Sequence, residues 1–422
     1  MHLGIISPPV PGHLHPFGAL GRELIERGHR VTLVHMADLE ERARGEGVDF
    51  IAIGERDHPR GSLAESLAQL SRLDGLAALR FTIAAIRKTT EMMLRDGPQA
   101  IEAARMDALL VDQTEPAGGT IAEHLGIPFV TVCNALALNR EPDVPPPFTG
   151  WDYRPGLLSR LRNAGAYSVF DRLLNPVNAV VRAYRKQWKL APHSDPESSF
   201  SPLAQISQQP AAFDFPRRRL PETFHYTGPL RKAPPKRIDF PWDRLDGRPL
   251  VYASLGTLQN RKAEVFRMFA EACRDLPVQL VIAHGGGLPA DIALPGNPLL
   301  SEYAPQLDVL ARARLTLTHA GLNTVLDSLT HGVPLVAIPI TYEQPAIASR
   351  IRWSGAGEVL PFSKLSVARL RRTVERVLGE PSYLRGAALV KESIARSGGV
   401  ERAATLIETA FEGGGAVTAS GL

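Results

Sequence analysis

A short turn between a buried strand and a helix has the residue types of an anion-binding site. Residues 318–324 read Thr-His-Ala-Gly-Leu-Asn-Thr and follow an apolar run that predicts a strand. The first turn of a helix has unpaired backbone N–H groups and a partial positive charge, so it can hold a diphosphate. Gly321 permits close backbone approach, and His319 and Thr324 add side-chain donors. Taken alone, the same residues fit an ordinary capped helix equally well.

Polar residues downstream extend this turn into a larger predicted site. Asp327 lies one turn into the helix on the face of Asn323, where a carboxylate can bind two ribose hydroxyls. The next apolar run, 333–339, leads into a loop with Glu343 and Gln344, an acid and an amide suited to sugar hydroxyls. Sites in α/β proteins lie at the carboxyl ends of parallel strands. The order of these residues therefore favours a continuous site over a plain helix cap.

A second group of candidates predicts a general base. His13 follows the first predicted strand and opens the first helix, where a neutral imidazole can take the proton of an acceptor hydroxyl. Asp112 ends another predicted strand. Because strand ends of one sheet face the same crevice, Asp112 can orient the imidazole and stabilise its charge. A lone His13 would more often only cap the helix, and His15 is a secondary candidate for the base.

The elements that must position these residues alternate along the chain. Short apolar runs and helical periodicity recur on both sides of a Pro- and Arg-rich stretch, 215–241. They predict an α/β protein of two facing, doubly wound, Rossmann-like domains, with the strand order left open. Strands are expected at 3–7, 31–35, 50–53, 108–111, 129–133, 250–254, 279–283, 315–318 and 335–339. Helices are expected at 17–27, 118–125, 262–274, 324–331, 346–353 and 400–411.

Composition excludes several classes of protein. The 422 residues include 48 basic and 44 acidic side chains, and a net charge of +4 does not indicate a nucleic-acid partner. Cys133 and Cys273 form no disulfide framework or metal-ligand pattern, which fits a reducing cytoplasm. No signal peptide and no apolar run long enough to span a membrane are expected. The sequence does not indicate an oligomeric state.

Four motifs within about 40 residues resemble the donor signature of the family 1 nucleotide-sugar glycosyltransferases, whose fold is GT-B. They are Tyr-Ala-Pro-Gln at 303–306, His-Ala-Gly-Leu-Asn-Thr at 319–324, Gly-Val-Pro at 332–334 and Glu-Gln at 343–344. A Ser-Leu-Gly-Thr loop at 254–257 resembles the family's second phosphate contact, although it also fits an ordinary turn. The donor residues that the resemblance implies are Gly12, Ser254, Gly256, Thr257, Tyr303, Ala304, Gln306, His319, Gly321, Asn323, Thr324, Asp327, Glu343 and Gln344.

The resemblance also implies a role for each group of residues. Tyr303 would flank the uracil and Gln306 would reach the base or ribose. The 319–324 turn would hold the diphosphate, Asp327 the ribose, and the 343–344 pair the transferred sugar. Plant relatives usually have Trp at the Tyr303 position and often Glu at the Asp327 position. A dTDP-sugar therefore stays an alternative to a UDP-sugar as the donor. His13 and Asp112 match the family's catalytic dyad.

A narrower resemblance, to bacterial zeaxanthin glucosyltransferases, covers most of the chain. It is carried by residues 111–118, 138–142, 200–208 and 253–259. It implies an inverting transfer of glucose from UDP-glucose, a co-substrate and not a cofactor, to a carotenoid hydroxyl; flavonoid, sterol or polyketide acceptors are alternatives. The chain contains no Asp-x-Asp motif, so no metal is expected. A nucleotide-sugar epimerase and a non-catalytic nucleotide-sugar-binding protein are less favoured, and the absence of a G-x-G-x-x-G turn after residue 7 disfavours a dinucleotide oxidoreductase.

From this resemblance we expect a separate role for each part of the chain. Residues 1–215 are expected to bind the acceptor, 216–240 to link, and 241–398 to bind the nucleotide sugar. A last helix at 399–412 is expected to pack back on the first domain, and 413–422 to form a disordered tail. The basic, amphipathic stretch 154–189 fits either a solvated helix packed on its domain or peripheral contact with the inner face of an anionic membrane.

Overall fold

The computed structural model describes residues 1–422 except 71, 74, 234–237, 257–261, 290–291 and 420–422. The first half of the chain forms a parallel sheet of seven strands in the order β3-β2-β1-β4-β5-β6-β7. Its strands are β1 (His2–Ile6), β2 (Arg30–His35), β3 (Asp49–Ala52), β4 (Ala108–Asp112), β5 (Phe129–Cys133), β6 (Gln205–Ser207) and β7 (Phe224–Tyr226).

The second half forms a parallel sheet of six strands in the order β10-β9-β8-β11-β12-β13. In both sheets the order reverses beside the first strand, and ligands of doubly wound folds bind at such switch points. The prediction of two doubly wound α/β domains is therefore confirmed. The strands are β8 (Leu250–Ser254), β9 (Gln279–Ala283), β10 (Leu299–Ser301), β11 (Ala313–Thr318), β12 (Leu335–Ala337) and β13 (Gly357–Val359).

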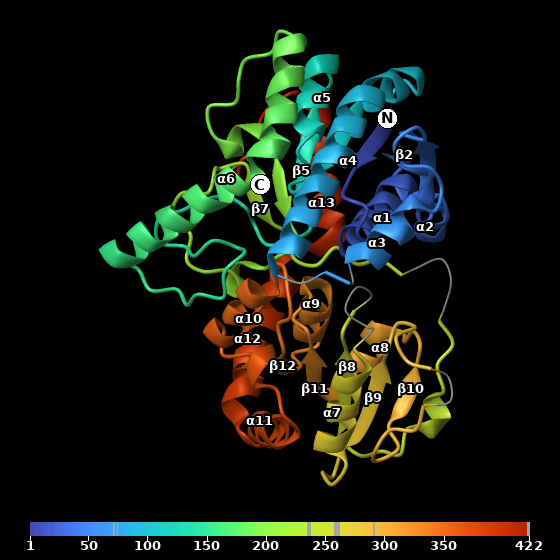
Figure 1. The fold of residues 1–422 in the computed structure, drawn as a ribbon, viewed down its shortest axis with the longest axis vertical. Helices are drawn as coiled ribbons and strands as arrows, with labels where there is room; N and C mark the ends of the chain where they lie inside the picture. The colour runs from blue at the N-terminus through green and yellow to red at the C-terminus, as the bar shows by residue number, and fades with distance from the viewer. Residues whose placement is uncertain (71, 74, 234–237, 257–261, 290–291, 420–422) are drawn as a thin grey trace.

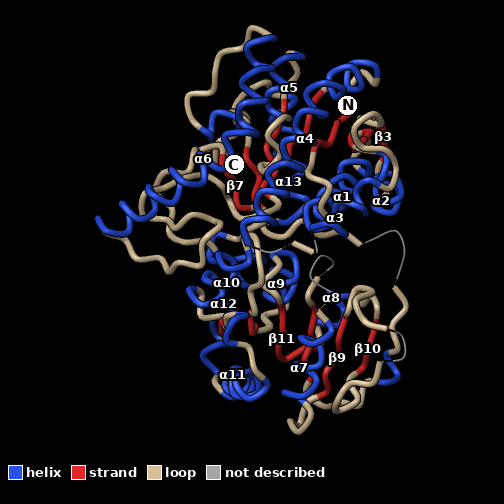
Figure 2. Tube along the Cα trace, in the orientation of Figure 1, coloured by secondary structure: helices blue, strands red, loops and turns tan. Residues whose placement is uncertain are grey.

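Helices flank the strands of both sheets, and the two domains meet across the middle of the molecule (Figures 1 and 2). Every residue of the central strands β1, β4, β5 and β8 is buried, as crossover helices on both faces require of a parallel sheet. The helices are α1 (Pro11–Glu26), α2 (Glu40–Glu46), α3 (Ser62–Leu70), α4 (Gly75–Ala103), α5 (Gly118–Leu125), α6 (Leu157–Gln187), α7 (Ala263–Cys273), α8 (Gln306–Leu310), α9 (Leu322–Thr330), α10 (Gln344–Trp353), α11 (Val367–Gly379), α12 (Pro381–Ser397) and α13 (Gly399–Glu412).

Four strands that the sequence did not predict are each three residues long. They are β6, β7, β10 and β13, and three residues are too few to show a hydrophobic period. Strand β7 corrects the predicted linker, because Phe224–Tyr226 lies within 216–240 and pairs with β6 of the first sheet. Of the described residues, no helix has both the length and the apolar character that crossing a membrane requires.

The chain end also corrects a prediction, because residues 413–419 are ordered on the first domain. Val417 is buried, and its N–H donates to the Leu203 carbonyl at 2.8 Å. The Val417 carbonyl accepts from His225 Nε2 at 2.9 Å. The preceding helix, α13, packs on α1. A run of three glycines indicated disorder, but Val417, which follows it, anchors the segment.

A buried ion pair joins the two domains near the cleft. Asp214, which follows β6, accepts from Arg350 Nη2 of α10 at 2.9 Å and from Arg217 Nε at 2.9 Å. The side chains of Asp214 and Arg350 are each 1% exposed. Arg350 also lies over the ring of Phe215 at 4.3 Å. Unpaired buried charges are costly, so this group fixes how α10 meets the first domain.

Candidate functional site

His13 and Asp112 are in direct contact at the carboxyl edge of the first sheet. His13 lies in the first turn of α1, after β1, and Asp112 is the last residue of β4, the neighbour of β1. Their side chains pair through His13 Nδ1 and Asp112 Oδ2 at 2.9 Å. A carboxylate only accepts, so Nδ1 carries the proton and Nε2 is left with a lone pair. The pair can therefore accept a proton from a bound hydroxyl.

Asp112 is held in place by three further donors. Its Oδ1 accepts from the N–H of Thr114 at 2.9 Å and from the Thr114 hydroxyl at 2.6 Å. Its Oδ2 accepts from Asn134 Nδ2 at 2.9 Å. The Asp112 side chain is fully buried, whereas that of His13 is 18% exposed. The acid is thus a fixed support behind an imidazole that reaches the cleft.

The electrostatics of the pair make His13 a stronger base than a free histidine. Burial disfavours the charged form of His13, but Asp112 outweighs it, with a smaller contribution from Glu343, and the pKa of His13 is raised. Burial would raise the pKa of Asp112, but His13 and Thr114 lower it overall. Asp112 therefore stays ionised while His13 gains and loses the proton. His15 is instead paired with Glu46 Oε1 at 2.5 Å, which leaves His13 as the histidine on a strand-end acid.

The 319–324 turn faces this pair from the second domain. Helix α9 begins at Leu322 with Gly321 as its N-cap, directly after β11. Thr318 of β11 pairs with Ser254 of β8, so the two predicted phosphate loops lie side by side. The Thr257 prediction falls outside the described residues. A diphosphate could thus meet both loops at once.

The imidazole of His319 fills the space between two glycines. A Cβ added at Gly256 would lie 2.8 Å from His319 Cε1, and one at Gly321 would lie 2.7 Å from both Cε1 and Nε2. Burial lowers the pKa of His319 to about 4, so the ring is neutral at physiological pH. Ala320, between His319 and Gly321 in the sequence, has a φ of 68°, which is rare for a residue with a side chain. Strain of this kind persists where the surroundings enforce it, commonly at ligand sites.

Asp327 and Gln306 are adjacent, as a shared ribose site requires. Gln306, the first residue of α8, donates from Nε2 to Asp327 Oδ2 at 2.6 Å, and its Oε1 accepts from the Tyr252 hydroxyl at 3.0 Å. The other Asp327 oxygen accepts from Arg231 Nε at 2.6 Å. Arg231 also donates to Asn323 Oδ1 at 3.1 Å. It thus links the predicted ribose and phosphate residues, and the sequence reading did not include it.

Hydrogen bonds between the domains join the first domain to the 319–324 turn and to Glu343. Asn323 Nδ2 donates to the Gly12 carbonyl at 2.8 Å, and Gln208 Nε2 donates to Asn323 Oδ1 at 3.2 Å. Glu343 Oε2 accepts from the N–H of Leu136 at 3.2 Å. Gln208, like Asn134, follows a strand of the first sheet, so both share the strand-end position that identified Asp112. That signal could have found Asn134, which follows the predicted strand at 129–133, but not Gln208, because β6 is too short to show a period.

The 343–344 pair divides into two different environments. Glu343 is the N-cap of α10, and burial raises its pKa. The side-chain oxygen of Gln344, Oε1, accepts from the N–H groups of Ile340 and Thr341 at 2.8 and 2.9 Å, so this side chain shapes the loop and leaves only its Nε2 for a ligand. Periodicity cannot reveal such an orientation.

Tyr303 and Ala304 lead from β10 into α8, at the outer side of the site. The Tyr303 side chain is exposed, with 53% of its surface accessible, so a planar base can stack on it. Ala304 is partly buried and packs beneath it against the core of the second domain. The structure thus places these two residues directly before Gln306, the first residue of α8.

Several buried polar side-chain atoms lack hydrogen-bond partners within the described residues, and three of them belong to residues that follow β5, β6 and β11. They are Asn134 Oδ1, Gln209 Nε2 and His319 Nδ1. Buried polar atoms are otherwise nearly always satisfied. All three residues follow the carboxyl ends of strands, where the other candidates also lie. A polar ligand in the cleft would supply the partners.

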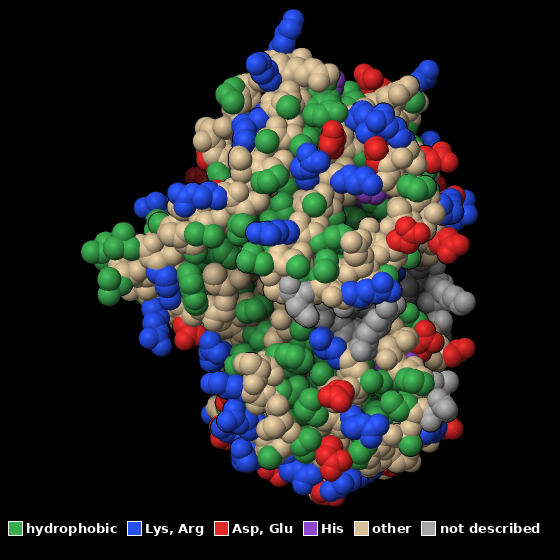
Figure 3. Space-filling model, in the orientation of Figure 1, with side chains coloured by type: hydrophobic (Ala, Val, Ile, Leu, Met, Phe, Trp, Pro, Cys, Tyr) green, Lys and Arg blue, Asp and Glu red, His purple; other side chains and the backbone are tan. Residues whose placement is uncertain are grey.

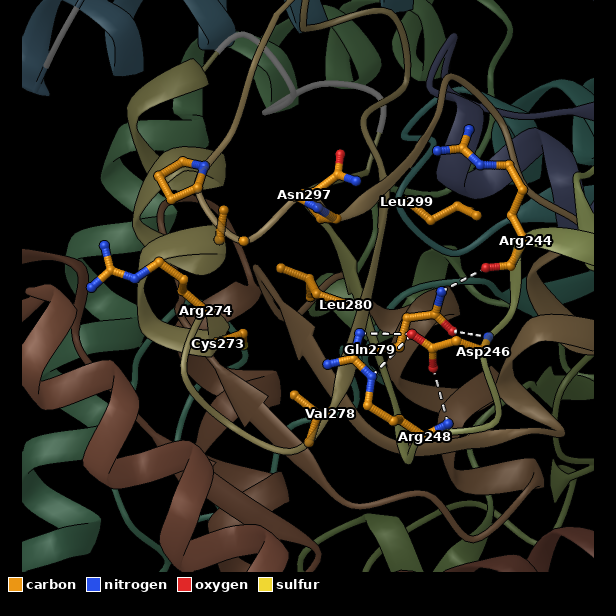
Figure 4. A pocket seen from close by; sticks show the side chains of 14 residues that line it. Arg244, Asp246, Arg248, Cys273, Arg274, Val278, Gln279, Leu280, Asn297 and Leu299 are labelled. Atoms are coloured by element: carbon orange, nitrogen blue, oxygen red, sulfur yellow. Dashed lines mark hydrogen bonds and ion pairs between the residues drawn. The ribbon is translucent and has the colours of Figure 1, made fainter.

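A hollow elsewhere in the second domain does not share these features. It lies at the amino ends of β8, β9 and β10, opposite the cleft, and Figure 4 shows Asp246, Arg248 and Gln279 joined to one another. Arg248 Nη2 is 2.7 Å from Asp246 Oδ2, and Gln279 Oε1 accepts from the N–H of Asp246. These three side chains therefore satisfy one another. The described residues also contain no cluster of His, Cys, Asp and Glu suited to a metal.

Comparison with known proteins agrees with the architecture. Residues 76–396 match the UDP-glucuronosyl and UDP-glucosyl transferase family, and residues 11–133 match the N-terminal domain of glycosyltransferase family 28. The zeaxanthin glucosyltransferase of Pantoea ananas is 35% identical over 96% of this chain and 95% of its own. That of Pseudescherichia vulneris is 34% identical over 99% of this chain and 100% of its own.

Solved structures share the fold at lower identity. The glycosyltransferase of kitacinnamycin superposes with a TM-score of 0.77 at 22% identity, covering 97% of this chain and 98% of that one. The calicheamicin glycosyltransferase CalG4 gives 0.74 at 24% identity with the same coverage. The two-domain arrangement is thus the GT-B fold. With the family match spanning most of its length, the chain is a glycosyltransferase and belongs to the UDP-glucuronosyl and UDP-glucosyl transferase family.

Proposed function

We propose that this enzyme transfers glucose from UDP-glucose to a hydroxyl group of an apolar acceptor, a carotenoid such as zeaxanthin, with inversion at the anomeric carbon. The observation that carries the mechanism is the contact of His13 with Asp112 opposite the amino end of α9. The substrates are carried over from the zeaxanthin glucosyltransferases that the chain resembles over nearly its full length. Flavonoid, sterol or polyketide acceptors, and a dTDP-sugar donor, remain the alternatives.

In the proposed reaction, His13 Nε2 takes the proton of the acceptor hydroxyl. The oxygen attacks the anomeric carbon from the face opposite the diphosphate, and the bond from that carbon to the β-phosphate oxygen breaks. UDP leaves with the electron pair, and its charge is stabilised by the backbone N–H groups at the start of α9 and by neutral His319. Asp112 stabilises the imidazolium that forms.

The remaining candidates would position the donor. Asp327 would bind the ribose while sharing its oxygens with Arg231 and Gln306, and Glu343 would accept from sugar hydroxyls. Tyr303 is exposed and suited to stacking on the uracil. Because an apolar acceptor dissolves in lipid, the proposed function includes peripheral contact with a membrane.

The experiment that tests this function is incubation with UDP-glucose and zeaxanthin, followed by mass spectrometry of the products. Appearance of zeaxanthin glucoside together with UDP supports it. Conversion of UDP-glucose alone into an isomer would indicate an epimerase instead. A panel of flavonoid and sterol acceptors and of dTDP-glucose, run in parallel, separates the alternative substrates.

Replacing Asp112 by asparagine is expected to lower kcat, by no more than the about 10²–10⁴-fold that a general base contributes, and to move the pH profile. In the wild type, the rate rises with pH as His13 loses its proton, and Asp112 places that pKa above the ordinary value. Without the carboxylate, burial dominates and the rising limb moves to lower pH. Profiles of kcat/KM against pH measure this. Asp49→Asn, in the exposed β3 pair with Arg30, is the control. An unmoved limb in Asp112→Asn would contradict the role given to the acid.

Replacing Gly321 by alanine is expected to weaken UDP binding by about tenfold, or 1.4 kcal/mol. The new Cβ would lie 2.7 Å from the His319 ring, so the ring or the α9 N-cap must move. Calorimetric titration with UDP measures the effect. Gly45→Ala in α2, where no atom lies within 4 Å of the added Cβ, is the matched control. Equal affinity in both variants would mean that this turn does not hold the nucleotide.

A further inference from the structure

The amino-terminal half of α6 extends away from the body of the protein. Helix α6 is 31 residues long and contains Pro176, which removes a backbone donor inside the helix. Figure 1 shows that the segment before this proline projects outward from the first domain. We refer to residues 143–173, which form this segment and the chain leading into it, as the projection.

The exposed surface of the projection is apolar. Its outward side chains are 73%, 83%, 62%, 54% and 37% exposed in the order of the sequence. The spacing of Leu158, Leu161, Val169 and Leu173 places them on one side of the helix. Hydrophobic side chains gather at the end of the projection in Figure 3. Asn163, on another side of α6, is buried. The exposed apolar residues are Leu157, Leu158, Leu161, Val169 and Leu173.

Contacts with the chain before α6 hold the projection in place. Phe148 stacks on Phe170 with ring centroids 4.2 Å apart. Arg140 lies over the ring of Tyr167 at 4.4 Å. Gly150 lies so close to α10 that an added Cβ would be 3.1 Å from Pro345, two residues after Glu343. The projection therefore has a fixed shape, and its base adjoins the loop that carries Glu343 and Gln344.

The charge of the projection is positive once its ion pairs are counted. It contains three carboxylates, each of which has an arginine partner: Asp143 with Arg160, Asp152 with Arg352, and Asp171 with Arg140. Arg172 is exposed and has no carboxylate partner among the described residues. Arg154 is 78% exposed, and its nearest carboxylate is 3.7 Å away and already paired. Arginines thus accompany the exposed leucines without free acids.

We propose that the projection docks the enzyme on an anionic lipid bilayer, with Leu157, Leu158 and Leu161 entering the interface and Arg154 and Arg172 facing the headgroups. Apolar side chains flanked by basic ones bind anionic membranes by these two contributions together. A second copy of the chain is a poorer occupant, because a symmetric contact would place the exposed arginines of both copies against one another. The proposal rests on the proposed function only for its purpose, which is to bring the cleft to an acceptor dissolved in lipid.

The test is co-sedimentation of the full chain with vesicles, in the absence of substrates. Binding to vesicles of phosphatidylcholine with phosphatidylglycerol is expected, with weaker binding to phosphatidylcholine alone and at high salt. Leu158→Ser/Leu161→Ser should lower binding at least about tenfold. Arg154→Gln/Arg172→Gln should remove the preference for the anionic lipid. The control is Leu384→Ser/Leu389→Ser in α12, whose leucines are 50% and 61% exposed.

Each result supports or overturns the proposal. Equal binding by the projection and α12 variants, or no binding by the wild type, overturns it. A dimer of the wild type that Leu158→Ser/Leu161→Ser dissolves, without vesicle binding, would identify an interface between copies instead. All substituted leucines are exposed, so the variants should keep the thermal unfolding of the wild type. No donor or acceptor is present in this test. Absence of vesicle binding would therefore overturn the docking proposal but not the proposed glycosyl transfer, which its own assay tests.

Discussion

Replacing His13 by alanine is expected to lower kcat for sugar transfer by about 10²–10⁴-fold, the usual contribution of a general base. The variant loses the acceptor for the hydroxyl proton but keeps the α9 turn and its contact with the Gly12 carbonyl. Donor affinity should therefore stay near that of the wild type. Steady-state kinetics and calorimetric titration with UDP together separate the two effects.

The matched control is His15→Ala, two residues away on the same helix. His15 is paired with Glu46 and its side chain is 62% exposed, so its loss should leave kcat nearly unchanged. Undiminished turnover in His13→Ala would show that another group takes the proton. A loss of UDP binding in that variant would show that His13 acts on the donor instead.

Replacing Asp214 by alanine is expected to lower the free energy of unfolding by about 3–5 kcal/mol. The substitution leaves Arg350 and Arg217 buried without their shared carboxylate; their side chains are 1% and 5% exposed. Burial would raise the pKa of Asp214, but the two arginines lower it to about 2. Its contribution is therefore present at neutral pH and is lost only as the pH falls toward that value.

Urea unfolding at neutral pH measures this change. Asp49→Ala is the control, because its pair with Arg30 is exposed on both sides, at 56% and 64%, and should contribute less than about 1 kcal/mol. A similar small loss in Asp214→Ala would mean that the buried group does not hold the domains together. Since Asp214 joins β6 to α10, the variant should also weaken donor binding through the neighbouring sugar loop.

The sequence predicted the parts of the site that stand at the ends of long elements. Asp112 and the 319–324 turn each follow an apolar run of at least four residues, and parallel pairing brings such ends to one edge. The cleft between the domains required the family resemblance, because periodicity does not give strand order. The structure supplied the order and the His13–Asp112 contact.

The residues that the sequence reading missed share a physical cause. Arg231 lies in an irregular segment after the three-residue strand β7, where no period indicates which way a side chain points. Gln344 Oε1 accepts from two N–H groups of its own loop, and the sequence does not show that these groups lie close to it. Val417 is anchored through backbone hydrogen bonds, which composition does not report.

In the proposed mechanism both domains contribute to the reaction. The proposed base and its supporting acid come from the first sheet, and the proposed anion-binding turn comes from the second. Arg231, Asn323 and Gln208 connect the two. The mechanism that we propose from this arrangement is direct attack of an activated hydroxyl on the anomeric carbon, without a covalent sugar intermediate.

The anomeric configuration of the product tests this central claim most directly. UDP-glucose carries an α-linked sugar, so a single displacement aided by His13 predicts a β-glucoside. The coupling constant of the anomeric proton, measured by NMR on the isolated zeaxanthin glucoside, distinguishes the two configurations. A β-linked product is the predicted result. An α-linked product would contradict direct displacement, and with it the role of His13 and Asp112.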